Sequence, residues 1–525
     1  MKVSDKKQII NFIILLGALA AVTATCWFRF DYLMDSDMAS ELVLSELLSK
    51  ENAVISPNWY YSTEIKFFSV QLIYTPLFKI FHDWTVIRTG AVIIMYMMIL
   101  ATVYYFLKQY QCECFWGIAG ALFLLPISDV YFKMVLCGAY YIPYVVINIL
   151  TIALIEHYIQ SGKKRLIVIL YILALLSGLG GIRPIAILYA PLGVESLIML
   201  IRRLKEQKDL LHGGRLFKDR EAGAYLHTGI SCGIALLGFA INESLLARYL
   251  SWGEWKQVSN LTGFSLIRLR DICKAIFDCF GGDMSGIPIW GYVCVMTAVL
   301  WIDYTICILI QNWRTKQKSL NRLAIFTVLS YLIFILLFLF TDMRLESRYF
   351  LSVIIFSFLM LAIDLKEKKN KRKEVFCMIL VTLTIISSVG VYRNIWRDNS
   401  GQDHITIAEF LCENDAVQGY ATFWNANVLT DLSNGEIEVW SWANSYDGGK
   451  TLMNSVDDIN HWLQLKAHTT EKPKGKVFVL LSEGEYQNIK WKDQLDEIPA
   501  DLNIQGAYRV WIFENYNELK KVLKD

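Results

Sequence analysis

Two clusters of charged residues follow long apolar segments, and both could carry chemistry. The first contains Asp35 and Asp37, directly after the first apolar segment, and the second contains Arg344, Glu346 and Arg348, between two later ones. A carboxylate in a partly desolvated cleft can take a proton from a hydroxyl group, and arginine side chains bind phosphate through paired hydrogen bonds. Together the clusters suggest transfer of a group from a lipid-linked phosphate to a hydroxyl.

The two aspartates also have structural interpretations. Asp37 stands directly before ASELVLSELL, where it would be a good N-cap for a helix. Asp35 is a less natural cap, because it stands two residues earlier, and could be a solvated loop residue. The Asp-Ser-Asp spelling also suggests a divalent metal, but two carboxylates leave most of a Mg²⁺ coordination shell unfilled. No Cys/His cluster has metal-ligand spacing, so we expect no cofactor.

Three further features extend the candidate substrate-binding set. Glu64 opens an amphipathic stretch, where it suits either a substrate or the positive end of a helix dipole. Arg183 follows a glycine run between two apolar segments and is a second phosphate candidate. For Arg344, Glu346 and Arg348 the alternative is a structural ion pair, with arginines reaching to lipid headgroups.

The elements that must position these residues are mostly membrane helices. The chain has 525 residues, of which 55% are hydrophobic, and its apolar residues fall in runs long enough to cross a bilayer. The net charge of +2 and the absence of a basic patch outside the loops give no sign of nucleic-acid binding. We predict eleven spans, at 9–28, 86–107, 115–128, 139–158, 166–180, 184–201, 224–246, 290–311, 323–340, 349–365 and 375–391.

Charge placement predicts the orientation. Lys and Arg collect in the loops at 163–165, 202–220, 314–322 and 366–373, and such loops face the cytoplasm. The chain is therefore expected to be a multi-pass protein of the cell membrane with a cytoplasmic N-terminus. Its first loop and its C-terminal tail would then lie outside the cytoplasm.

These two outer parts differ in character. The first loop, at 29–85, has amphipathic patterns at 38–49 and 62–81 that are too short to span and suit the membrane interface. The tail, at 392–525, alternates short helical and strand patterns and predicts a small α/β domain beside a membrane domain at 1–391. Its predicted helices are 405–412 and 426–432, and its strands are 419–423, 436–440, 476–481 and 508–513.

This layout resembles the GT-C superfamily of integral membrane glycosyltransferases, in particular bacterial members related to protein mannosyltransferases (glycosyltransferase family 39). The resemblance rests on the Asp35-Ser36-Asp37 motif, the two juxtamembrane helices, the later turn with Arg344, Glu346 and Arg348, and the outer C-terminal domain. It implies a polyprenyl-phosphate-linked sugar donor and an acidic base in the first outer loop, which either Asp35 or Asp37 matches. The family often has adjacent Asp and Glu, whereas Ser36 separates the acids here.

The expected function is therefore transfer of a sugar from a polyprenyl-phosphate donor to a hydroxyl of a glycan, lipid or protein acceptor in a bacterial cell envelope, among membrane lipids. Two other classes stay open. A transporter or flippase of lipid-linked sugars would use charges inside apolar runs, such as Glu156, Glu195, Glu243 and Asp303. A non-catalytic membrane scaffold would not depend on Asp35 or the arginines.

Overall fold

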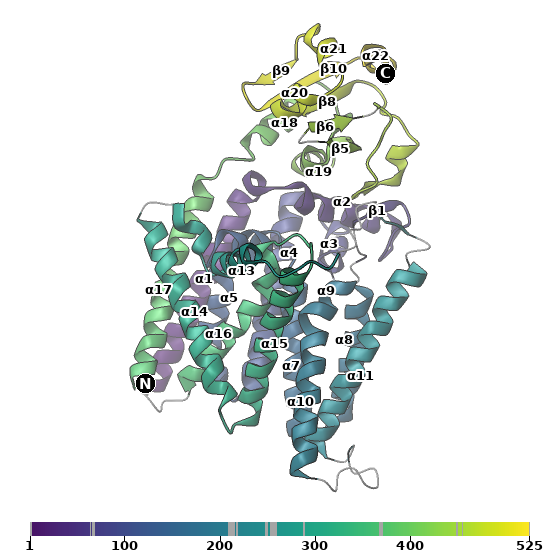
Figure 1. The fold of residues 1–525 in the computed structure, drawn as a ribbon. Helices are drawn as coiled ribbons and strands as arrows, with labels where there is room; N and C mark the ends of the chain where they lie inside the picture. The colour runs from purple at the N-terminus through teal and green to yellow at the C-terminus, as the bar shows by residue number, and fades with distance from the viewer. Residues whose placement is uncertain are drawn as a thin grey trace.

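The protein is a bundle of long helices with a smaller sheet-containing domain at one end (Figure 1). The computed structural model describes residues 3–62, 65, 69–207, 216, 219–246, 250–252, 260–286, 289–366, 371–447, 450–453 and 455–523.

Each of the eleven predicted spans contains a helix. They are α1 (Val3–Leu33), α4 (Trp84–Gln109), α5 (Trp116–Leu124), α7 (Ile142–Ser161), α8 (Lys164–Leu179), α10 (Ala190–Glu206), α11 (Arg220–Ile241), α14 (Trp290–Trp313), α15 (Lys318–Phe340), α16 (Leu351–Lys366) and α17 (Lys371–Arg397). Within the described ranges, nine segments are long and apolar enough to cross a membrane. The chain is therefore an α-helical polytopic membrane protein, as predicted.

The two other predicted spans are the short ones. Helix α8 has 16 residues, and α5 has 9. The segment Glu113–Leu124 that contains α5 is bent by 99° against the following segment Asp129–Cys137. Close packing holds α8 in the bundle, because a Cβ on Gly178 would lie 2.0 Å from Ala235 O of α11. Small residues at helix contacts allow such an approach.

Short elements connect the spans. They are η1 (Glu113–Phe115), α6 (Asp129–Tyr131), η2 (Phe132–Cys137), α9 (Ile182–Pro184), η3 (Ile185–Tyr189), η6 (Asn242–Leu246), β2 (Ser251–Trp252), α13 (Leu266–Cys279), η7 (Gly282–Gly286) and η8 (Ser347–Phe350). Three of them, η2, η3 and η6, are π-helical turns, which are frequent at functional sites.

The first loop lies between the bundle and the C-terminal domain (Figure 1). It contains α2 (Ser36–Glu51), β1 (Trp59–Tyr61) and α3 (Gln71–Phe78). Helix α2 matches the first predicted interfacial helix. The prediction of a second helix from residue 62 was wrong in extent, because a strand ends at Tyr61 and the helix begins only at Gln71. Strand β1 pairs with β2 and with β7 (Gln464–Leu465) of the C-terminal domain, which holds the chain extended up to Tyr61, directly before the predicted start of the helix.

The C-terminal domain is built on one five-stranded mixed sheet. Its strand order is β4-β3-β8-β10-β9, with β3 parallel to β4 and β8, and β10 antiparallel to β8 and β9. The predicted tail elements appear as α18 (Gln402–Glu413), β3 (Gln418–Thr422), α19 (Phe423–Leu432), β4 (Glu438–Trp442), β8 (Val477–Ser482) and β10 (Tyr508–Phe513). Elements not predicted are β5 (Asn444–Asp447), β6 (Lys450–Met453), β7, η9 (Lys466–Thr469), α20 (Glu483–Asn488), α21 (Lys492–Asp496), β9 (Leu502–Ile504) and α22 (Tyr516–Val522).

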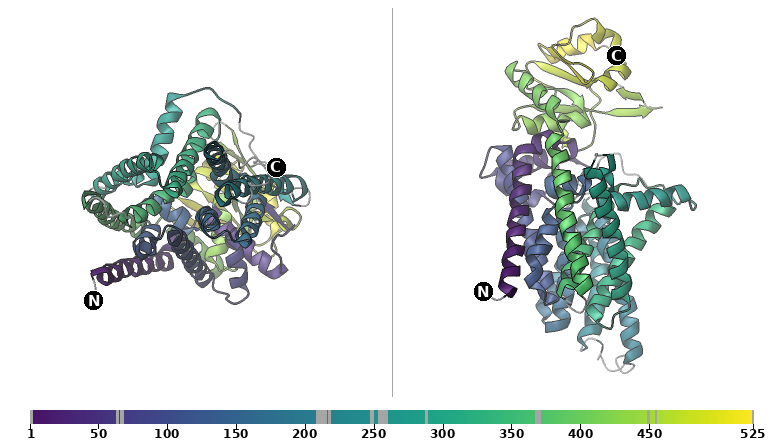
Figure 2. Two further views of the ribbon diagram at one scale, coloured as in Figure 1. Left: turned by 90° about the horizontal axis from the view of Figure 1, so that it is seen from below. Right: turned by 90° about the vertical axis from the view of Figure 1, so that its left-hand side faces the viewer.

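The bundle and the C-terminal domain are joined covalently by α17, which continues past residue 391 to Arg397 and leads into α18 (Figure 2). They are also joined by a buried ion-pair cluster. Arg88 of α4 contacts both Asp31 of α1 and Asp431 of α19, and the Arg88 and Asp431 side chains are only 2% and 0% exposed. A charge in this setting requires its partners, so the cluster fixes α19 against the bundle.

Candidate active site

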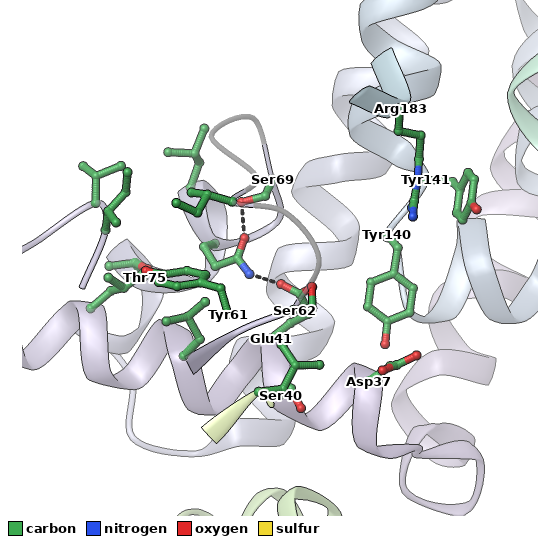
Figure 3. A pocket seen from close by; sticks show the side chains of 18 of the residues that line it. Asp37, Ser40, Glu41, Tyr61, Ser62, Ser69, Thr75, Tyr140, Tyr141 and Arg183 are labelled. Carbon is green, nitrogen blue, oxygen red and sulfur yellow. Dashed lines mark hydrogen bonds between the residues drawn. The ribbon is translucent and has the colours of Figure 1, made fainter. Parts of the chain in front are cut away.

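A cavity of about 380 Å³ lies where the first loop, the helix bundle and the C-terminal domain meet. Helix α2 contributes Asp37 to its lining, the turn before α7 contributes Tyr140 and Tyr141, and two membrane segments contribute Arg183 and Arg348. Figure 3 shows the Asp37 carboxylate facing the Tyr140 hydroxyl, with Arg183 and Tyr141 to one side. The structure thus brings three predicted site residues, Asp37, Arg183 and Arg348, to one cavity.

The two aspartates have different places. The Asp35 side chain accepts a hydrogen bond of 2.8 Å from Met38 N and is the N-cap of α2. The interpretation of Asp37 as the cap was therefore wrong. The helix begins two residues earlier than the pattern suggested, which places Asp37 in its first turn. From there Asp37 lines the cavity, whereas Asp35 does not belong to the lining.

Burial controls the ionisation of the capping residue. Loss of solvent raises the pKa of Asp35 to about 6, and the neighbouring Asp37 charge adds to this, while the Met38 N–H and the positive charges of Arg348 and Lys133 oppose it. Burial and the nearby Asp35 and Asp37 carboxylates likewise raise the pKa of Tyr140, whose hydroxyl therefore keeps its proton near neutral pH.

The cationic end of the cavity is built around one aromatic ring. The guanidinium carbon of Arg183 lies 5.7 Å from the centre of the Tyr349 ring, and that of Arg348 lies 6.0 Å from the same centre. The Tyr141 hydroxyl, in the same lining, is buried and has no hydrogen-bond partner within the described part of the chain. Two cations and an available hydroxyl donor suit an anionic group with several acceptor oxygens.

The remaining predicted residues lie elsewhere. Arg344 Nε is 2.6 Å from Glu346 Oε1, the Arg344 side chain is 86% exposed, and neither residue lines the cavity. The ion-pair interpretation therefore describes Arg344 and Glu346, and only Arg348 of this cluster reaches the site. Glu64 lies outside the described residues.

Comparison with solved structures identifies the fold of the chain. The apo crystal structure of ArnT from Cupriavidus metallidurans, a GT-C protein, aligns with a TM-score of 0.55 over 95% of this chain and 97% of that chain, at 9% sequence identity. An oligosaccharyltransferase of Archaeoglobus fulgidus aligns with a TM-score of 0.44, at 11% identity, over 82% of this chain and 64% of that one. No family model and no curated protein sequence matches the chain. The chain has the GT-C fold.

Several residues that line the cavity of this GT-C fold were not predicted from the sequence. Glu41 accepts a hydrogen bond from Gln71 Nε2, and Ser69 Oγ donates to Gln71 Oε1, so this chain of contacts connects α2 to α3 (Figure 3). Glu41 stands four residues after Asp37, a spacing that puts both on one helix face. That spacing was the available signal for Glu41, whereas Trp462 and Leu463, which the C-terminal domain adds to the lining, had none.

Two of the four charges that favoured a transporter, Glu156 and Glu195, have a structural partner in the GT-C bundle. Arg322 Nε is 2.8 Å from Glu195 Oε1, and Arg322 Nη1 is 3.1 Å from Glu156 Oε1, with all three side chains buried. A buried charge normally needs such pairing, which accounts for both glutamates without a transport role. Among the described residues, no group of three or more His, Cys, Asp or Glu could hold a metal ion.

Proposed function

We propose that this GT-C protein is a glycosyltransferase that moves a sugar from a polyprenyl-phosphate-linked donor to an acceptor hydroxyl. The observation that carries the proposal is the single cavity that Asp37 shares with Arg183 and Arg348. A carboxylate and a pair of arginines in one cleft provide the two functions that such a transfer needs, a proton acceptor and a site for a leaving phosphate.

The arginine end would hold the donor phosphate. During transfer the bond between the anomeric carbon and the phosphate oxygen breaks, and the electron pair stays on the phosphate. Arg183 and Arg348 would stabilise this developing charge, and the buried Tyr141 hydroxyl would donate a further hydrogen bond. The polyprenyl chain would leave the cavity toward the lipid, because Arg183 and Arg348 each stand at the start of a candidate membrane span.

Asp37 would act as the general base. The acceptor oxygen forms the new bond to the anomeric carbon while its proton passes to the Asp37 carboxylate. Asp35 would act through α2, because it caps the helix that carries Asp37. The phosphate leaves as an anion and does not have to be protonated, so the transfer needs a base for the acceptor hydroxyl and no acid for the leaving group.

The site would face the outside of a bacterial cell membrane. The basic loops predict a cytoplasmic N-terminus. The cavity is lined by α2 and by Trp462 and Leu463 of the C-terminal domain, and Figure 1 shows α2 and this domain at the end of the bundle opposite the N-terminus. A sugar already attached to a lipid on that face would need no nucleotide, and we expect no metal requirement.

A test uses the full-length protein in proteoliposomes with a panel of undecaprenyl-phosphate-linked hexoses as donors and with glycosides and hydroxyl-bearing peptides added as acceptors. We expect release of undecaprenyl phosphate from at least one of them, and a loss of at least tenfold in the Arg183→Gln/Arg348→Gln variant. Arg344→Gln is the matched control, because it removes an exposed arginine outside the cavity, and it should keep full turnover. Movement of the donor across the bilayer without release of undecaprenyl phosphate would refute the proposal in favour of a flippase.

A further inference from the structure

One wall of the cavity comes from the C-terminal domain. Trp462 and Leu463, directly before β7, line it together with residues of α2 and the first loop. Trp462 is half-buried. The cavity thus consists of a cationic part on the bundle and a second part between α2, α3 and this wall.

The wall is fixed by three sets of contacts. Asn427 Nδ2 of α19 donates to Leu463 O at 2.8 Å and to Ser40 Oγ at 2.7 Å. Strand β7 pairs with β1 of the first loop. The buried Gln464 side chain accepts from Ser441 N at 3.2 Å and also donates to Asn460 O. Trp462 is therefore held at the cavity by a segment anchored on both sides.

The polar groups of this second part are small and closely spaced. Ser62 lines it, as does the chain of contacts from Ser69 through Gln71 to Glu41. Thr75 also lines it, and its buried hydroxyl has no hydrogen-bond partner within the described residues. Figure 3 shows Ser62, Ser69 and Thr75 on the left of the view, with Asp37 and Arg183 on the right.

We infer that this second part binds the acceptor, and that the acceptor presents a sugar ring which packs on Trp462. This inference rests on the proposed function and names its acceptor class. The electron-rich face of an indole attracts the C–H edge of a pyranose, while the ring hydroxyls find the hydroxyl, amide and carboxylate groups opposite. A serine or threonine side chain offers a single hydroxyl and no ring face, so it would make fewer of these polar contacts and none with the face of Trp462.

The volume of the cavity agrees with an acceptor that presents a sugar ring. About 380 Å³ is near the lower end of the range of roughly 300–1,000 Å³ for ligand pockets. A donor headgroup and one or two acceptor rings fit such a space, whereas a folded acceptor protein would have to bind outside it.

The test is saturation-transfer NMR on the full-length protein in lipid nanodiscs. The probes are methyl α-mannoside, methyl β-galactoside and N-acetylthreonine methylamide. We expect saturation of the ring protons of at least one glycoside and none of the threonine amide. Trp462→Leu should reduce the glycoside signal at least fivefold, and Trp462→Phe, which keeps an aromatic face, should retain most of it.

Trp424→Leu is the matched control, because Trp424 belongs to the same domain, is 56% exposed and does not line the cavity. An unchanged glycoside signal in Trp462→Leu, an equal loss in Trp424→Leu, or saturation of the threonine amide alone would overturn the inference. If Trp462→Leu does not fold, 5-fluorotryptophan labelling of the wild type decides instead. The ¹⁹F resonance that Trp462→Phe removes should then shift on addition of the glycoside, and no shift would overturn the inference.

Native mass spectrometry of the same preparations with undecaprenyl phosphate separates the two proposals. Glycoside binding that depends on Trp462, without binding of undecaprenyl phosphate, would refute the proposed donor and leave the sugar site standing. Binding of undecaprenyl phosphate that depends on Arg183 and Arg348, without glycoside binding, would refute the acceptor inference alone.

Discussion

Asn427 of the C-terminal domain and Ser40 of the first loop are joined by a buried hydrogen bond of 2.7 Å. Ser40 lies on α2 one turn from Asp37, and both line the cavity. The same Asn427 nitrogen reaches Leu463 O on the opposite wall. The C-terminal domain is therefore part of the structure that shapes the site and is more than an appendage of the bundle.

Asn427→Ala should damage turnover through the shape of the cavity. It removes both hydrogen bonds and leaves buried acceptors unpaired, which should cost about 1–3 kcal/mol of folding stability. Because Asn427 is a positioning residue that does not line the cavity, we expect KM for the acceptor to rise more than kcat falls, measured by undecaprenyl phosphate release.

Asn488→Ala is the control for that variant. The Asn488 side-chain amide donates a hydrogen bond to Gly484 O, and this bond is exposed at the surface of the C-terminal domain. This variant should leave both kinetic parameters unchanged. Unchanged kinetics in Asn427→Ala would show that the two walls hold their positions without this contact.

The protonation of Asp35 should make stability depend on pH. Its folded-state pKa of about 6 lies above the usual value for aspartate, about 4, so the folded state binds the extra proton between these values. Stability from this group is therefore complete below about pH 4 and is lost as the pH rises to about 6, by about 3 kcal/mol in total.

Asp35→Asn provides the measurement, because asparagine is an equally good N-cap and does not titrate. Thermal unfolding in nanodiscs should show the wild type losing stability relative to Asp35→Asn as the pH rises from 4 to 6, with no further change above. A parallel pH dependence of the two midpoints would contradict the assignment.

The cluster of Arg88, Asp31 and Asp431 should resist single substitutions. Arg88→Met leaves the Asp431 carboxylate buried without its cation, which should cost about 3–5 kcal/mol. Arg88→Met with Asp431→Leu removes both buried charges and should recover most of the thermal stability. The partner Asp31 is 42% exposed and can be solvated. A double variant no more stable than Arg88→Met would show that the pair does more than compensate charge.

Much of the fold could be predicted from local patterns. Apolar runs of more than twenty residues predict helices such as α4 and α15, and short apolar runs predict strands such as β8 and β10. Both patterns arise because these elements are buried. Strand β1 was missed because its partners, β2 and β7, are distant in the sequence. Trp462 was not predicted as a site residue for a similar reason, because the segments with which it lines the cavity are distant in the sequence.

The kinds of residue in the site could be predicted from the sequence, but their individual roles could not. Asp35, Asp37 and Arg348 stood out as charged residues beside long apolar segments, yet the roles of the two aspartates depend on the start of α2, which lies two residues before the predicted one. Arg88 stands near the start of an apolar helix and could have been singled out by the same rule. Its partner Asp431 could not, because only the folded chain brings α19 to α4.

The most direct test of the central claim compares three variants in the assay of undecaprenyl phosphate release. Asp37→Asn should lower turnover by at least a hundredfold with undecaprenyl phosphate still bound, because general base catalysis is worth about 10²–10⁴. Asp35→Asn should stay within a few-fold of the wild type, and Asp35→Ala should be less stable. Full turnover in Asp37→Asn, or its loss in Asp35→Asn alone, would contradict the account.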